Sequence, residues 1–166
     1  MFLLSRIAGL VLAAALAVTP VLTQDRTAEL RSRFSKEADP VRKAKLLPQL
    51  SDSEFHQIQP LLAAGNLTEA AAIADQLAAE AEAAVKGLDA RGRDPETHDA
   101  GYRQAEISVR GSLRRMDDIL IGLSADEQKP FADVRRRLDE LNHHLIRELF
   151  PHRPDAPPAP PNEPKG

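Results

Sequence analysis

The spacing of apolar residues between positions 24 and 150 constrains the fold of this chain more than any other feature. Apolar side chains recur there three and four positions apart, whereas alternating runs of β-branched residues are almost absent. The first pattern lays an apolar stripe along a helix, and the second is what a half-buried strand would need. Aromatic residues make up only 4% of the chain, so the core must consist of Leu, Ile, Val and Ala side chains, which suit closely packed helices. The sequence therefore predicts an all-α fold.

Capping signals divide the first half of this region into short helices. The spacing predicts a first helix over residues 27–38. Asp39 is then a typical N-cap, followed by Pro40 at the first helical position, which predicts a short second helix. Residues 51–54 match a capping box, so we expect a further helix to begin there and to end at Gly65 in a left-handed turn.

Three long helices are predicted to follow. The first begins after Asn66 and ends at Gly92, and the second begins at residues 94–95, an Asp-Pro pair. The third begins at a second capping box, residues 124–127, and Pro130 is expected to kink or restart it. The three apolar stripes are Leu67, Ala70, Ala74, Leu77, Ala81, Ala84 and Leu88, then Tyr102, Ala105, Val109, Ser112, Met116, Ile119 and Leu123, then Phe131, Val134, Leu138, Leu141 and Leu145.

These helices predict an antiparallel helical bundle over residues 24–150, with coiled-coil-like packing. Three long helices joined by short turns would bury their stripes against one another, and the shorter N-terminal helices would close the bundle. Residues 26–47 hold seven basic and three acidic side chains, while residues 67–90 hold five acidic and one basic. Opposite charges favour these two segments as neighbours. A wide apolar stripe on the first or last helix could equally close a homodimer.

Residues 1–23 have the pattern of an export signal. Arg6 precedes an apolar run over residues 7–18, and small side chains offer cleavage after Ala17 or after Thr23. The alternative is an uncleaved membrane anchor, although the run is shorter than the roughly 20 residues of a spanning helix. We expect a cleaved signal peptide and therefore a periplasmic or extracellular protein, which contacts a membrane only if this segment is retained.

The other end of the chain is rich in proline. Seven of the 13 prolines lie in residues 151–166. Such a segment cannot hold a helix or pair in a sheet, so we interpret it as a disordered tail. A ligand for an aromatic groove and a spacer in the cell wall are the alternatives.

Composition excludes several kinds of chemistry. The chain has no cysteine, which excludes disulfides, thiol catalysis, thiolate zinc sites and the acylated cysteine of a lipoprotein. A net charge of −3 argues against nucleic-acid binding. None of the common catalytic or phosphate-binding motifs occurs. We therefore predict that the protein is not an enzyme, and we assign no catalytic, cofactor-binding or metal-binding residue.

Two charged clusters are candidate binding sites. His144 lies four residues from Glu148, a spacing at which a histidine and a carboxylate can hold a metal ion, but such pairs are common on solvated helix faces. The run of arginines at residues 135–137 suggests an anionic partner. Its members lie four residues from acidic ones, in the pairs Asp133–Arg137, Arg135–Asp139 and Arg136–Glu140, so we interpret this charge as balanced along its own helix.

Two segments resemble known families. Residues 61–77, LLAAGNLTEAAAIADQL, resemble the turn of a tetratricopeptide repeat, which implies a helical hairpin. Leu50-Ser51-Asp52-Ser53-Glu54 and Leu123-Ser124-Ala125-Asp126-Glu127 are similar to the Leu-Thr-x-x-Gln helix starts of the Spy/CpxP periplasmic chaperones and metal-stress sensors. A plain capping box explains both segments equally well.

These observations predict an exported, non-catalytic helical protein that acts as an interaction or structural module of the cell envelope. We expect protein partners. The alternative is a Spy/CpxP-like periplasmic chaperone or stress adaptor that binds unfolded clients.

Overall fold

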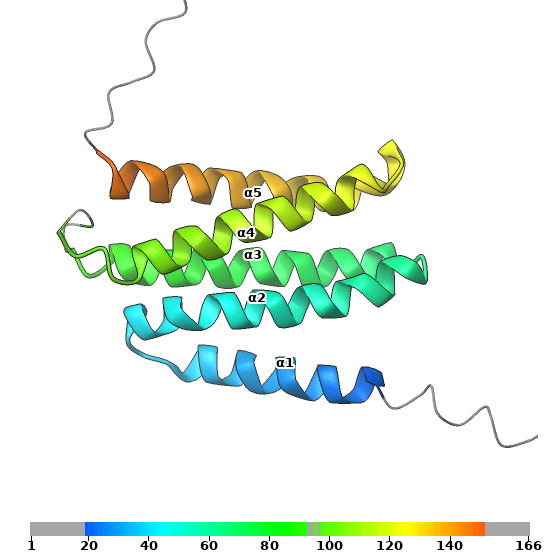
Figure 1. The fold of residues 1–166 in the computed structure, drawn as a ribbon, viewed down its shortest axis with the longest axis horizontal. Coiled ribbons are helices and arrows are strands. Elements are labelled where there is room, and N and C mark those ends of the chain that lie inside the picture. The colour runs from blue at the N-terminus through cyan, green and yellow to red at the C-terminus, as the bar shows by residue number, and fades with distance from the viewer. Residues whose placement is uncertain (1–18, 93–94, 96, 152–166) are drawn as a thin grey trace, which may run out of the picture.

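Five α-helices form the part of the chain that the structure, a computed structural model, describes: residues 19–151 except 93–94 and 96. Figure 1 shows them side by side, with each helix running opposite to the one before it. No strand occurs in these residues, so the predicted all-α fold is confirmed. The helices are α1 (Thr19–Lys36), α2 (Pro40–Ala63), α3 (Leu67–Asp89), α4 (Tyr102–Ile121) and α5 (Ala125–Leu149).

Helices α2 to α5 form a four-helix bundle. Helix α2 packs against α3 and α4, and α5 packs against the same two helices, while α3 and α4 also approach each other across the middle. The order around the bundle is therefore α2, α3, α5, α4, in which the connection from α3 to α4 crosses the bundle. The helical hairpin implied by residues 61–77 is present as α2, Gly65 with φ 73°, and α3. Helix α1 lies outside, against α2 (Figure 1).

The core consists of the stripes that the sequence predicts. Leu77, Met116 and Leu138, one from each of the three predicted long helices, are at most 2% exposed. The other stripe residues are buried too, apart from a few at the helix ends and Leu141, which are partly buried against the core. The 3.6-residue period thus identified the buried face of each helix.

Helix α2 corrects the predicted division of residues 40–63. The sequence predicts two helices with a break at Ser51, but α2 is continuous and contains Pro48. Its buried stripe, which includes Leu47 and Leu50, runs on across the expected break, and this packing outweighs the hydrogen bond that a proline removes. Ser51 and Glu54 are buried inside the helix and do not cap it. The structure thus has four long helices besides α1, where the sequence predicts three.

The start of α4 corrects a second boundary. The sequence predicts a helix beginning at residues 94–95, yet α4 begins at Tyr102, and Pro95 lies in a turn. The residue before α4 is Gly101, whose φ of 98° is in the left-handed region. A Cβ atom at this position would lie 2.7 Å from Cδ2 of Leu88 and 3.4 Å from Val41. The chain enters α4 here because only glycine combines this conformation with so close an approach.

Gly101→Ala should therefore destabilise the fold by about 1–3 kcal/mol, since alanine meets both backbone strain and a clash. Gly111→Ala, inside α4 with no atom within 4 Å of its Cβ position, is the matched control and should be neutral or slightly stabilising. Urea unfolding followed by circular dichroism measures both variants. Equal stability of the two would contradict the conformation assigned to Gly101.

The start of α5 confirms the second capping box. The backbone N–H of Ser124 donates to Glu127 Oε2 at 2.9 Å, and the hydroxyl of Ser124 donates to the same oxygen at 2.6 Å. These bonds lower the pKa of Glu127 below its ordinary value. The helix does not restart at Pro130, because α5 continues through it. Pro130 is in the second turn, where its missing N–H removes one hydrogen bond only.

The structure describes the two ends of the chain only in part. Helix α1 begins at Thr19, earlier than the predicted residue 27 and within the segment interpreted as an export signal. Residues 1–18, which hold the apolar run, and residues 152–166 of the proline-rich tail lie outside the described residues. Within residues 19–151, as far as they are described, no helix combines the length and the apolar character that crossing a membrane requires.

Candidate functional site

The backbone of helix α1 approaches that of one neighbour, α2. Its apolar residues Leu30 and Phe34 are buried, and its backbone approaches α2 but not α3. Thr27, near the middle of α1, is also buried and shares a 2.6 Å hydrogen bond with Ser53 of α2. Because α1 and α3 both pack on α2 but not on each other, a groove remains between them.

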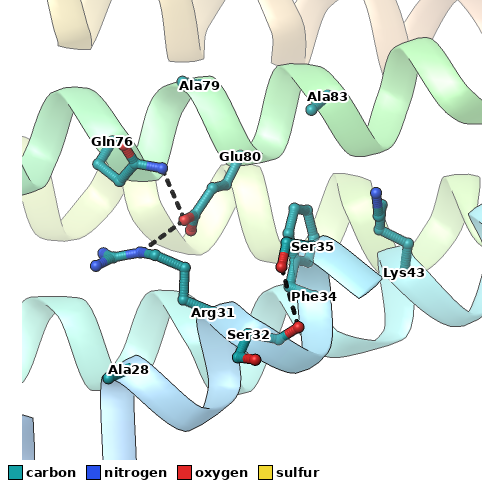
Figure 2. A pocket seen from close by; sticks show the side chains of 10 residues that line it. All are labelled: Ala28, Arg31, Ser32, Phe34, Ser35, Lys43, Gln76, Ala79, Glu80 and Ala83. Atoms are coloured by element: carbon teal, nitrogen blue, oxygen red, sulfur yellow. Dashed lines mark hydrogen bonds and ion pairs between the residues drawn. The ribbon is translucent and has the colours of Figure 1, made fainter. Parts of the chain in front are cut away.

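This α1–α3 groove has a volume of about 780 Å³ and is open to solvent. Its volume lies within the range of ligand sites, roughly 300–1,000 Å³. Figure 2 shows side chains of α1 and α3 facing each other across it, with Lys43 of α2 toward one end. The groove is lined by Ala28, Arg31, Ser32, Phe34, Ser35, Lys43, Gln76, Ala79, Glu80 and Ala83.

Arg31 links the three helices around the groove. Its Nη2 atom donates to Glu54 Oε1 of α2 at 2.5 Å, and its Nε atom donates to Glu80 Oε1 of α3 at 2.9 Å. Gln76 donates a third hydrogen bond to the same oxygen of Glu80 at 2.9 Å, and Figure 2 shows how it and Arg31 converge there. Glu54 and Glu80 are 0% and 5% exposed. The two buried carboxyl groups thus hold α1 in place through one guanidinium.

Two carboxyl groups that share one positive charge cannot both ionise easily in a buried site. Oε2 of both Glu54 and Glu80 is buried and has no hydrogen-bond partner among the described residues. Burial, reinforced by the negative charge of Glu80, raises the pKa of Glu54 to about 8 against the opposing effect of Arg31. Glu54 is therefore mostly protonated at neutral pH, and its carboxyl O–H can donate a hydrogen bond to a neighbouring carboxylate.

Arg31 itself stays charged. Burial lowers its pKa, but the hydrogen bonds to Glu54 and Glu80 outweigh this effect and raise the pKa above its ordinary value. With Glu54 protonated, the cluster carries the Arg31–Glu80 ion pair and no net charge.

Lys43 is the second cation of the groove. Its Nζ atom lies 5.1 Å from the centre of the Phe34 ring, a cation–π distance. Within the described part of the chain, no carboxylate lies at ion-pair distance from Lys43, which is only partly buried. This ammonium group therefore has a positive charge available to a ligand.

The arginines at residues 135–137 of α5 form ion pairs with partly different residues from those predicted. Arg136 pairs along its own helix with Glu140 at 2.7 Å, as predicted, and also with Asp133 at 2.5 Å. Arg135 pairs instead with Asp117 of α4 at 2.8 Å. This part of the run therefore ties α5 to its neighbour as well as to itself.

Arg137 faces α3. It donates two 2.8 Å hydrogen bonds to the carboxylate of Glu82 and another to Asp75, and its predicted partner Asp133 lies 3.9 Å away. The hydrogen bonds with Glu82 raise the pKa of Arg137 and lower that of Glu82. Arg137 thus joins α5 to α3 and offers little charge to a ligand.

His144 also acts between helices. Its Nε2 atom lies 3.0 Å from Oδ2 of Asp89, whose other oxygen accepts a 3.0 Å hydrogen bond from the hydroxyl of Tyr102. The contact with Glu148 is longer, 4.0 Å from Nδ1. Burial, together with the bond to Asp89, raises the pKa of Tyr102 to about 12. Nowhere in the described residues do three or more His, Asp or Glu side chains form a group that could hold a metal ion.

Sequence reasoning missed the cluster of Arg31, Glu54 and Glu80. In the sequence Glu54 has the position of a capping-box residue, and no motif marks Arg31 or Glu80. One signal did point to them, because the opposite charge excess of residues 26–47 and 67–90 predicts that these segments are neighbours. The Arg31–Glu80 pair confirms that prediction.

No protein-family model, no curated protein and no solved structure matches the chain.

Proposed function

We propose that this protein is a non-catalytic interaction module of the cell envelope, which binds another protein through its helical bundle. The α1–α3 groove is the observation that carries the proposal. It is an open surface of about 780 Å³ whose walls are fixed by buried polar contacts, and it presents an unpaired ammonium group. A preformed groove of this kind suits binding, because little conformational freedom is lost on association.

The first 23 residues support the location. A single arginine before an apolar run of about a dozen residues is typical of an export signal. Outside the cytoplasm the bundle must be stable without disulfides, since the chain has no cysteine. Its long buried stripes and interhelical ion pairs supply that stability.

The exposed surface supports one selective partner. Among the described residues, the large apolar side chains that are exposed are Ile107, Ile121 and Phe150. None of them lines the α1–α3 groove. A surface for many unfolded clients would need a wider apolar area than these separate residues provide.

Mild cross-linking of tagged full-length protein in its native cells, followed by purification and mass spectrometry, tests the proposal. We expect one stoichiometric partner protein. Many unrelated, partly unfolded clients would contradict it and favour the chaperone alternative. Recovery of the protein cross-linked only to itself would also contradict it and favour a homodimer with a structural role.

A further inference from the structure

The α1–α3 groove has the length and direction that a docked helix requires. Besides Phe34, its lining residues on α1 are Ala28, Arg31, Ser32 and Ser35, and those on α3 are Gln76, Ala79, Glu80 and Ala83. On both helices they follow a spacing of three and four, so the groove runs parallel to both axes for two turns, about 10 Å. A helix laid along it, over the Arg31–Glu80 pair that spans the groove, would contact both walls, as in a bundle.

Small side chains make such an approach feasible. Two of the four α3 residues that line the groove are alanines, Ala79 and Ala83, and Ala28 and two serines face them from α1. Ser35 already donates its hydroxyl to the backbone oxygen of Ser32 at 3.0 Å, so it presents little unsatisfied polarity. Side chains of this size let two helix backbones come close together.

The charged side chains of the groove indicate which kind of helix could bind there. The charged residues that line the groove are Arg31, Lys43 and Glu80, and Arg31 and Glu80 already pair with each other. Lys43 is left as an uncompensated positive charge at one end. Lys43 is partly exposed, whereas Gln76, Ala79 and Ala83 of the opposite wall are uncharged and the buried Glu80 is already paired with Arg31.

We propose that the α1–α3 groove binds an acidic amphipathic helix of a partner protein, which lays small apolar side chains on Ala79 and Ala83 and a carboxylate against Lys43. This proposal rests on the interaction function proposed above and names its surface and the chemistry of its partner. Groove recognition of an amphipathic helix is a common mode of peptide binding.

A synthetic peptide tests the proposal directly. The probe is a fluorescent amphipathic helix of about five turns with Ala and Leu on one face and Glu on its flanks, and the comparison peptide has Lys in place of each Glu. We expect the acidic peptide to bind, more weakly as salt is added, and the basic peptide to bind at least about tenfold more weakly, as measured by fluorescence anisotropy.

Two variants locate the binding site. Lys43→Glu reverses the charge and Ala83→Trp fills the groove, and each should weaken binding of the acidic peptide at least about tenfold. The matched controls on α5 are Lys129→Glu and Ala132→Trp, both at exposed positions, and they should bind as the wild-type protein does. Circular dichroism shows whether all four variants are folded.

Failure of this proposal is distinct from failure of the proposed function. Absence of binding by the acidic peptide, or equal binding by the groove variants and their controls, would overturn the groove assignment. If the partner cross-linked in cells were still captured by Lys43→Glu and Ala83→Trp, the interaction function would stand on another surface. If no partner were captured by the wild-type protein, the function itself would fail.

Discussion

At pH 8 the Glu54→Gln variant should be more stable than the wild-type protein, with a free energy of unfolding higher by on the order of 3 kcal/mol. Glutamine keeps the shape of the protonated glutamic acid and stays neutral at every pH. Its amide oxygen can accept the hydrogen bond of Arg31, and its amide N–H can donate to Glu80. The variant thus keeps the contacts of the cluster without a second buried negative charge.

The sign of the pH dependence follows from the raised pKa. In the folded protein the pKa of Glu54 is about 8, above its ordinary value of 4.5. Between these two values the folded protein holds a proton that the unfolded chain releases. The stabilising contribution of protonated Glu54 is therefore complete below pH 4.5 and is lost as the pH rises through 8.

Urea unfolding of both proteins from below pH 4.5 to above pH 8 measures this effect. The two stabilities should converge at the acid end and diverge as the pH rises. Glu29→Gln, at an exposed position of α1, is the control and should follow the wild-type curve. Parallel curves for Glu54→Gln and the wild-type protein would show that Glu54 is not protonated in the folded state.

Met116→Asp should destabilise the protein strongly. Met116 is completely buried in α4, where a carboxylate would be out of contact with water. A loss on the order of 4 kcal/mol is expected, a large part of the roughly 5–15 kcal/mol by which domains are stable. The helical signal of circular dichroism and its melting temperature measure the loss.

The same helix offers the control for this variant. Ile121, at the end of α4, is 84% exposed, so Ile121→Asp places the same charge in water and should leave the melting temperature nearly unchanged. A Met116→Asp variant that melts like Ile121→Asp would show that the core is packed differently.

The helices were predictable from the sequence because their signals are local. Leu77 and Met116 follow the period of their own helices, and the 3.6-residue repeat needs no knowledge of other segments. The cap at Ser124 is equally local, since its partner Glu127 is only three residues away. Fold class and core positions therefore emerged correctly.

The predicted helix boundaries are wrong where contacts with distant residues determine the structure. Ser51 and Glu54 look like a helix start in the sequence, but Ser51 faces Ser108 of α4 at 3.4 Å and Glu54 binds Arg31 of α1. Neither partner is visible from neighbouring residues. Without them, a buried polar pair inside a helix is indistinguishable from a capping box.

The candidate site was predictable only in outline, for the same reason. Net charge indicated that the segments around Arg31 and Glu80 are neighbours, whereas the groove depends on α1 packing against α2 alone. That arrangement depends on all the contacts between the helices together, so no short sequence motif predicts it.

Site-specific photo-cross-linking in living cells tests the central claim, that a partner binds in the α1–α3 groove, most directly. A photoreactive amino acid replaces Ala83 in the groove or, as the control, Ala132 on the exposed face of α5. We expect a discrete adduct with one other protein from position 83 and none from position 132. The same adduct from both positions, or from position 132 alone, would contradict it.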